Sequence, residues 1–141
     1  MSNTYSVCAS CESINRVDTD RALAKVPTCG KCGKDLPMHS LVSEVSAAGL
    51  KKLLAKADRP VIVDFWASWC GPCRSYAPQF EAASKSLRDA VFVKVDTEKN
   101  QALASELGIR GIPTTIVFKN GKEYRRESGV IPEAAIPSLV R

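Results

Sequence analysis

The chain has a single histidine, no apolar run long enough to cross a membrane, and no dense block of like charges. A membrane helix needs about 20 consecutive apolar residues, and no window of the sequence approaches that length. The first thirty residues carry charges throughout and lack the apolar core of a signal peptide. We therefore expect no membrane association and a cytoplasmic protein, in which thiols are kept free or metal-bound.

The charge balance is mildly basic and dispersed. Lys and Arg number 20 against 15 Asp and Glu, which gives a net charge of +5. The excess is not gathered into runs, so we expect a surface that tolerates acidic partners and no nucleic-acid site. With 141 residues, of which 45% are hydrophobic, the chain can form one sizeable core and a small appendage.

Six cysteines are the most informative residues present, and two of them follow a predicted buried strand. Residues Val61–Ala67 are apolar on both alternating faces, as in a central strand covered by helices on both sides. Asp64 is the exception. A carboxylate costs several kcal/mol in a dry sheet unless it is neutralised, paired or hydrated. Asp64 is therefore either a functional group that serves the cysteines or a structural buried polar residue.

A helix is predicted directly after Trp69. Pro72 suits the first turn of a helix, and apolar residues recur at helical spacing up to Leu87. Cys70 then lies at the helix N-terminus, where unpaired amides and the helix dipole lower a thiol pKa from about 8.5. Cys73, one turn later, can form a disulfide with Cys70. The pair favours redox chemistry, and the alternative is half of a metal site.

The other four cysteines form two Cys-x2-Cys pairs, Cys8/Cys11 and Cys29/Cys32, with seventeen residues between the pairs. This spacing is typical of a zinc ribbon, in which four thiolates surround one structural zinc ion that stabilises a segment poor in apolar residues. The alternatives are structural disulfides and an additional redox couple. His39 could replace one ligand, but four thiolates suffice, so we expect an exposed histidine in a linker.

Periodicity and turn residues predict the remaining elements. The expected strands are Leu41–Val45, Ala90–Asp96, Thr114–Lys119 and Lys122–Arg126, and the expected helices are Ser46–Ala57, Asn100–Leu107 and a short segment limited by Pro132 and Pro137. Asn120-Gly121 is a strong hairpin signal. Residues 18–24 are expected to form a loop or short turn. This order predicts an α/β fold whose binding site lies at the carboxyl ends of the strands, where Cys70 is placed.

Three motifs together resemble the thioredoxin family: Val63-Asp64-Phe65-Trp66-Ala67, Trp69-Cys70-Gly71-Pro72-Cys73 and Gly111-Ile112-Pro113-Thr114. The resemblance covers roughly residues 37–141, and the four earlier cysteines narrow it to bacterial thioredoxins of the second type, which have an N-terminal zinc module. It implies the thioredoxin fold, a mixed five-stranded sheet with helices on both faces, over residues 37–141. A small zinc-ribbon-like domain over residues 1–36 precedes it.

The resemblance also implies roles for individual residues. In the family, the lysine that matches Lys94 lies near the buried aspartate and influences the thiols with it; from the residues alone, Lys94 is equally a polar residue of an alternating strand. The peptide that matches Ile112-Pro113 is cis and pairs with an extended substrate segment. The implied substrate-binding rim consists of Trp69, Gly71, Pro72, Ile112, Pro113, Gly129 and Val130. The chain departs from the family at Arg74, where a lysine is usual.

Together these observations predict a protein-disulfide reductase. Cys70 attacks a disulfide of a substrate protein, Cys73 resolves the mixed disulfide, and Asp64 accepts the proton of Cys73. Pro72 offers no group that stabilises the thiolate further, which favours a reducing enzyme.

The resemblance implies electron transport from a flavin-containing thioredoxin reductase that uses NADPH, and we expect a monomer that acts under oxidative stress. Two alternatives have a different function. One is a zinc-dependent redox sensor or chaperone, in which oxidation of the ribbon cysteines ejects zinc. The other is a protein-binding module to which a thioredoxin domain is attached.

Overall fold

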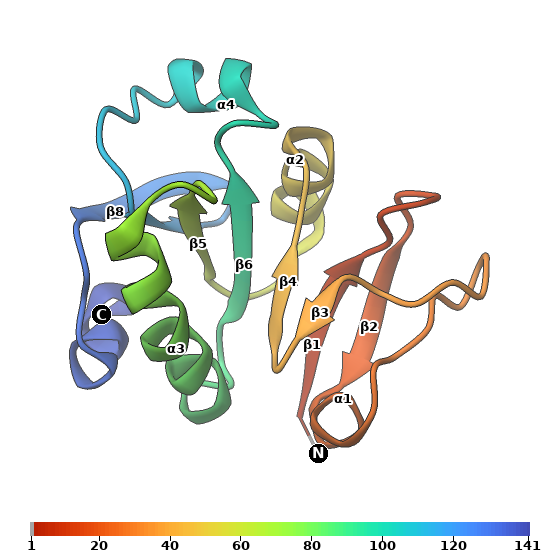
Figure 1. Ribbon diagram of the computed structural model, residues 1–141. Helices are drawn as coiled ribbons and strands as arrows, with labels where there is room; N and C mark the ends of the chain where they lie inside the picture. The colour runs from red at the N-terminus through yellow and green to blue at the C-terminus, as the bar shows by residue number, and fades with distance from the viewer. Residues whose placement is uncertain (1) are drawn as a thin grey trace.

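A six-stranded mixed sheet forms the centre of the molecule, and a separate two-stranded sheet lies beside it (Figure 1). The computed structural model describes residues 2–141. Its elements, in chain order, are β1 (Asn3–Val7), β2 (Ile14–Asp18), α1 (Thr19–Ala24), β3 (Met38–His39), β4 (Val42–Glu44), α2 (Ala47–Lys56), β5 (Val61–Trp66), α3 (Gly71–Ser86), β6 (Val91–Asp96), α4 (Gln101–Glu106), β7 (Thr114–Lys119), β8 (Lys122–Ser128) and the 3-10 helix η1 (Glu133–Val140). The strand order of the large sheet is β3-β4-β6-β5-β7-β8.

The predicted central strand is confirmed. Strand β5 pairs with β6 in parallel and with β7 antiparallel, and Val61–Phe65 are buried. One face of the sheet packs against α2 and α4 through Leu50, Leu53 and Leu103. The other face packs against α3 and η1 (Figure 1). This double cover explains why β5 is apolar on both of its faces.

The fold class is confirmed, with additions that the sequence did not indicate. The five expected strands are present, and β3, only two residues long, adds a sixth at the edge beside β4. The hairpin at Asn120-Gly121 is also present, because both residues adopt the positive φ that such a turn requires (53° and 78°). The C-terminal segment is a 3-10 helix that continues past Pro137 to Val140. Its buried Ile136 and Leu139 are three residues apart, the repeat of a 3-10 helix.

The expectation of a loop or short turn over residues 18–24 is wrong, because Thr19–Ala24 form helix α1. The Asp18 side chain caps this helix by accepting a hydrogen bond from the Arg21 amide at 3.1 Å. An aspartate at this position is a common N-cap, so a local signal was present. His39, expected in a linker, belongs to β3; it is exposed, lies 2.7 Å from Glu81 and is not part of the four-cysteine cluster.

The cysteine-rich segment packs against the part of the chain that forms the large sheet. Tyr5 and Val7 of β1 belong to the same buried cluster as Leu50 and Leu53 of α2. The Ser6 and Ser43 hydroxyl groups form a buried hydrogen bond at 2.6 Å, which joins β1 to β4. Figure 1 shows the β1-β2 hairpin on the β4 side of the large sheet. Two sheets that could have been separate units thus share one apolar core.

Candidate functional site

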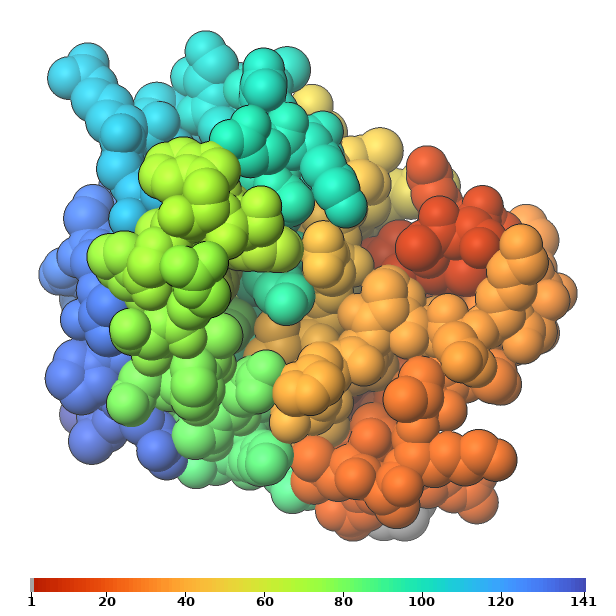
Figure 2. All heavy atoms as spheres, viewed as in Figure 1, coloured from red at the N-terminus to blue at the C-terminus, as the bar shows by residue number. Residues whose placement is uncertain are grey.

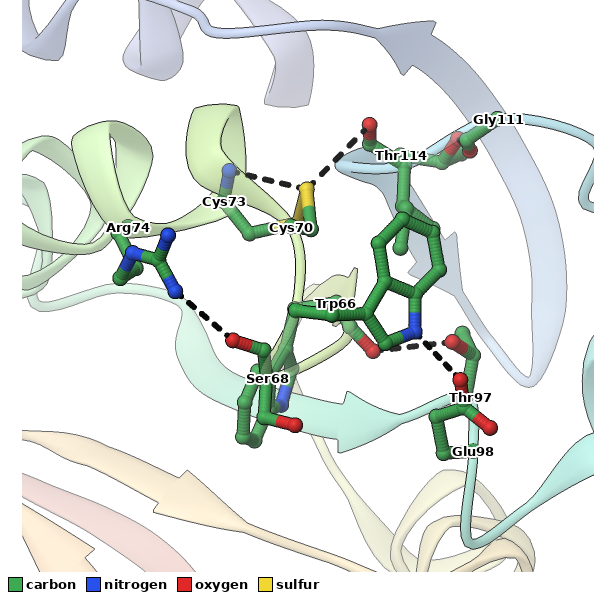
Figure 3. Close-up of a disulfide and its surroundings, with 11 residues drawn as sticks. Trp66, Ser68, Cys70, Cys73, Arg74, Thr97, Glu98, Gly111 and Thr114 are labelled. Atoms are coloured by element: carbon green, nitrogen blue, oxygen red, sulfur yellow. Dashed lines mark hydrogen bonds between the residues drawn. A yellow bond between two sulfur atoms is a disulfide. The ribbon is translucent and has the colours of Figure 1, made fainter.

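Cys70 and Cys73 form a disulfide at the start of α3 (Figure 3). Their Cα atoms are 5.2 Å apart. Cys70 is the N-cap residue of the helix, and its sulfur accepts a hydrogen bond from the Cys73 amide at 3.1 Å. Both sulfur-bearing residues are buried. The donated amide and the helix dipole favour negative charge on Cys70 when the disulfide is reduced.

The loop before α3 holds the pair in place. Pro72 occupies the first turn of the helix, as its missing N–H allows. The Arg74 guanidinium donates a hydrogen bond to the Ser68 carbonyl at 3.0 Å, which closes the loop around the cysteines (Figure 3). Arg74 thus has a defined contact at the position where the chain departs from the family pattern.

A second loop lies directly against the disulfide. The Ile112-Pro113 peptide bond is cis, and the Cys70 sulfur lies 3.7 Å from the Ile112 carbonyl oxygen. The Gly129 amide donates a hydrogen bond to the Pro113 carbonyl at 2.8 Å, so the end of β8 lies beside this loop. Residues far apart in the sequence therefore meet around Cys70.

The predicted rim also has an exposed apolar part. The Trp69 side chain is 65% exposed, and Val130, which follows Gly129, is exposed as well. The Trp69 indole N–H donates to the Glu98 carboxylate in the loop after β6. Glu98 was not predicted, and no local sequence pattern marks it.

Asp64 lies behind the pair, on β5. It is 3% exposed, and its Oδ1 has no hydrogen-bond partner among residues 2–141. Burial raises the pKa of Asp64 to about 7, against the opposing charge of Lys94. The two residues are register partners on β5 and β6, and the Lys94 ammonium lies 5.0 Å from the centre of the Trp66 ring.

Asp64 and Cys73 line one small cavity. Its volume is about 260 Å³, and its lining includes Asp64, Lys94, Cys73 and Arg74. The space is large enough for water molecules with several polar partners. Water in this cavity would lie between Cys73 and Asp64.

The other four cysteines converge on one point. The sulfur atoms of Cys8, Cys11, Cys29 and Cys32 all lie within 4.8 Å of one another. The Cys8–Cys32 and Cys11–Cys29 pairs are both separated by 3.6 Å. A tetrahedral ion with metal–sulfur distances of about 2.3 Å places its ligand sulfurs about 3.8 Å apart. The four sulfurs therefore fit a tetrahedral metal site.

The electrostatics of this cluster also favour a cation. The Cys32 amide, the Asn15 side chain and the Lys31 amide lower the pKa of the Cys29 thiol to about 6. The Lys34 amide lowers the pKa of Cys32, but the neighbouring thiols and burial raise it to about 11. Four sulfurs this close cannot all be ionised without a positive charge among them. A divalent ion would supply that charge.

The fold and the disulfide at the carboxyl end of β5 define the class of this protein: it is a thiol–disulfide oxidoreductase with the thioredoxin fold. The family model for thioredoxin matches residues 41–141, and a second model, described as thioredoxin 2, N-terminal, matches residues 7–34. The chain belongs to the thioredoxin family, whose members reduce disulfides in proteins, and it has the N-terminal zinc ribbon of thioredoxin 2.

Known relatives support the assignment of the chain to the thioredoxin family. The chain is 38% identical over 126 residues to thioredoxin C-3 of Corynebacterium nephridii, covering 89% of this chain and 85% of that protein. It is 40% identical over 100 residues to thioredoxin of Porphyra purpurea, covering 70% and 94%. Among solved structures, Fasciola hepatica thioredoxin is 38% identical with a TM-score of 0.63, covering 67% of this chain and 91% of that one. In residues 2–141, no helix has the length and apolar character needed to span a membrane.

Proposed function

We propose that Cys70 is the attacking sulfur of the reductase and that Cys73 resolves the mixed disulfide. The observation that supports this assignment is the position of the Cys70 sulfur at the N-cap of α3. There it accepts a hydrogen bond from the Cys73 amide and lies beside the Ile112 carbonyl. In the reduced protein, an incoming substrate disulfide can reach Cys70 from the side of the exposed Trp69.

The reaction then transfers two electrons to the substrate. The Cys70 thiolate bonds to one sulfur of the substrate disulfide, and the other substrate sulfur leaves as a thiolate. The Cys73 thiol loses its proton, attacks the Cys70 sulfur and releases the second substrate thiolate. The products are the Cys70–Cys73 disulfide and two substrate thiols.

Asp64 accepts the Cys73 proton in this scheme. A base is most effective when its pKa is near the working pH, and burial raises the pKa of Asp64 to about 7. The cavity that both residues line gives the proton a path, directly or through water. Lys94 tunes this group, because its positive charge opposes the upward shift of the Asp64 pKa.

The substrate main chain lies along the Ile112-Pro113 loop, within the rim formed by Trp69, Gly71, Pro72, Ile112, Pro113, Gly129 and Val130. The contacts of Ile112 with Cys70 and of Pro113 with Gly129 support this surface.

One zinc ion is held by Cys8, Cys11, Cys29 and Cys32 and has a structural role. The fit of the four sulfurs to a tetrahedron and the need for positive charge among them support this assignment. Zinc bound there would stabilise the folded ribbon. We place the boundary between the ribbon and the thioredoxin domain after residue 36, because Leu36 packs in the cysteine cluster and β3 begins at Met38.

The physiological setting follows from the same chemistry. We infer that a flavin-containing thioredoxin reductase, using NADPH, returns the Cys70–Cys73 disulfide to the dithiol. Four free or metal-bound thiols require a reducing compartment, which supports a cytoplasmic protein. We propose a monomer that supports electron transport to oxidised proteins during oxidative stress.

An insulin-type disulfide reduction assay with zinc measured in the same samples tests this function. We expect Cys70→Ser to lose reduction and to retain one zinc per chain. Cys32→Ser is the matched control, and it should lose zinc while its Cys70–Cys73 pair still cycles. Reduction that survives in Cys70→Ser would refute the assignment.

A further inference from the structure

A groove of about 410 Å³ is lined by residues of both the ribbon and the thioredoxin-fold part of the chain. Its buried and half-buried lining includes Val7, Pro37 and Val45, and its exposed lining includes Ala9 and Lys99. Figure 2 shows the hollow between the ribbon hairpin (red) and the segment after β6 (teal). This volume is within the range of ligand-binding clefts. The disulfide chemistry described above does not use it.

The groove opens at the same edge of the sheet as the active cysteines. Strands β4, β6 and β5 are parallel neighbours in that order, so their carboxyl ends share one edge. Val45 follows β4, Lys99 follows β6 and Cys70 follows β5. The groove, the loop after β6 and the active-site loop therefore form a row along this edge.

The loop after β6 joins the active site to the groove. Glu98 accepts the Trp69 indole N–H, and the next residue, Lys99, lines the groove. The Asp96 carboxylate accepts the Glu98 amide at 2.9 Å, and the Asn100 side chain accepts the first amide of α2, also at 2.9 Å. These contacts join the loop after β6 to the start of α2.

The opposite wall of the groove is equally fixed. Val7 is part of the shared core, and the Ser6–Ser43 hydrogen bond anchors its strand. The Arg59 guanidinium also donates to the Asn3 carbonyl at 2.6 Å. The ribbon thus provides a preformed wall.

We propose that this groove binds an extended segment of the substrate protein that flanks the cysteine bonded to Cys70. An apolar side chain of that segment packs on Val7 and Val45. The inference rests on the proposed role of Cys70 and adds the ribbon to the substrate-binding surface. Neighbouring strands are about 4.8 Å apart, so the ends of β5 and β4 are separated by about 10 Å. An extended chain spans about 3.3–3.6 Å per residue, so a flank of roughly three residues reaches Val45 at the near wall of the groove.

A polypeptide fits the groove better than a nucleic acid does. The lining includes the carboxylates of Glu12 and Glu44, which repel phosphates, and it includes no aromatic side chain on which a base could stack. Continuity with the Trp69 surface also favours a segment that is already attached at Cys70.

The test uses peptides that each have one cysteine in a disulfide with a chromophoric thiol. On one side of the cysteine or the other, each peptide has a polar flank of two to eight residues. Each flank is made with and without a leucine near its end. For the zinc-loaded full-length protein, we expect one flank direction to raise the rate constant of reduction about five- to tenfold when the leucine reaches the groove. Equal rate constants for short and long flanks would overturn the proposal.

Two tryptophan variants locate the effect. Ala9→Trp fills the groove, whereas Ser10→Trp places the same side chain on the adjacent exposed residue outside the groove lining. With zinc content equal in both variants, Ala9→Trp should lose the gain from the long flank and keep the rate for the short peptide. Ser10→Trp should keep both rates.

A gain that persists in Ala9→Trp would overturn the proposal, as would an equal fall for short and long peptides. An oligonucleotide that binds the wild type but not Ala9→Trp, with peptide rates unchanged, would assign the groove to nucleic acid and contradict the inference. Failure of the proposed function is distinguishable, because the short peptide disulfide would then not be reduced at all.

Discussion

Asp64 shows how one buried residue links stability to chemistry. Its pKa is raised from 3.8 to about 7, so between these values the folded protein binds more protons than the unfolded chain. The free energy of unfolding therefore falls as the pH rises from about 4 to about 7, and it stays low above that range. The carboxylate destabilises the fold at the pH where it can act as a base.

Asp64→Asn should accordingly stabilise the protein. Above pH 7 we expect the free energy of unfolding to rise by up to about 4 kcal/mol, and near pH 4 the gain should vanish. Denaturant unfolding at pH 4, 6 and 8 measures both values. A gain that is the same at all three values would show that packing, not charge, is responsible.

The same substitution should separate the two chemical steps. We expect Asp64→Asn to slow release of the reduced substrate from the mixed disulfide by about 10²-fold or more, because the Cys73 proton then has no acceptor. Initial attack by Cys70 should change much less. Single-turnover kinetics with a chromophoric disulfide resolve the steps, and unchanged rates for both would exclude Asp64 as the base.

Lys94 provides a second check on this site. Its charge lowers the pKa of Asp64, so Lys94→Met should raise that pKa above about 7. The pH at which the release step reaches half of its maximum should move upward with it. Lys122→Met, on the exposed strand β8, is the control. A pH profile that does not move in Lys94→Met would show that the two charges are not coupled.

At the scale of single elements, the packing of β1 against α2 attaches the ribbon to the rest of the molecule. The Tyr5 ring is 3% exposed, and the Arg16 and Arg59 guanidinium groups lie 5.5 and 5.3 Å from its centre. Cation–π contacts of this kind add to the apolar burial of the ring. Loss of this side chain should therefore affect both sheets.

We expect Tyr5→Ala to lower the free energy of unfolding by about 3–5 kcal/mol. Tyr124→Ala is the matched control, because that ring is 45% exposed on β8 and should cost much less. Urea unfolding of both variants measures the difference. Equal costs would mean that β1 does not share the core.

The sequence predicted the elements that have strong local signals. Strand β5 is apolar on both faces, and α3 has Pro72 and regular apolar spacing, so both were predicted with nearly their observed bounds. The β1-β2 hairpin was not predicted, because its two strands contain few apolar residues. These strands pair on the two sides of the turn that contains Cys8 and Cys11. The docking of Tyr5 and Val7 on α2 depends on long-range contacts that no local pattern encodes.

The residues of the candidate site also include some that local patterns predicted and some that they did not. Cysteine spacing predicted both the Cys70–Cys73 pair and the cluster of four cysteines in the ribbon. Glu98 and the groove at Lys99 could not be predicted, because they depend on how three strand ends lie side by side.

At the scale of the whole molecule, metal binding should be coupled to the stability of both sheets. If the proposed zinc ion stabilises the ribbon, its removal frees Tyr5 and Val7, which belong to the same apolar cluster as Leu50 and Leu53. We expect chelation to lower the temperature of the main unfolding transition, seen by calorimetry, by several degrees. A lowered transition that returns on adding zinc supports this coupling, and an unchanged transition would contradict it.

The most direct test of the central claim, that Cys70 attacks and Cys73 resolves, is to trap the mixed disulfide. Reduced Cys73→Ser and Cys70→Ser are each mixed with a disulfide-bearing protein, and covalent complexes are identified by mass spectrometry. We predict a stable complex through Cys70 in Cys73→Ser and little or none in Cys70→Ser. A complex that forms readily through Cys73, or forms equally in both variants, would contradict the claim.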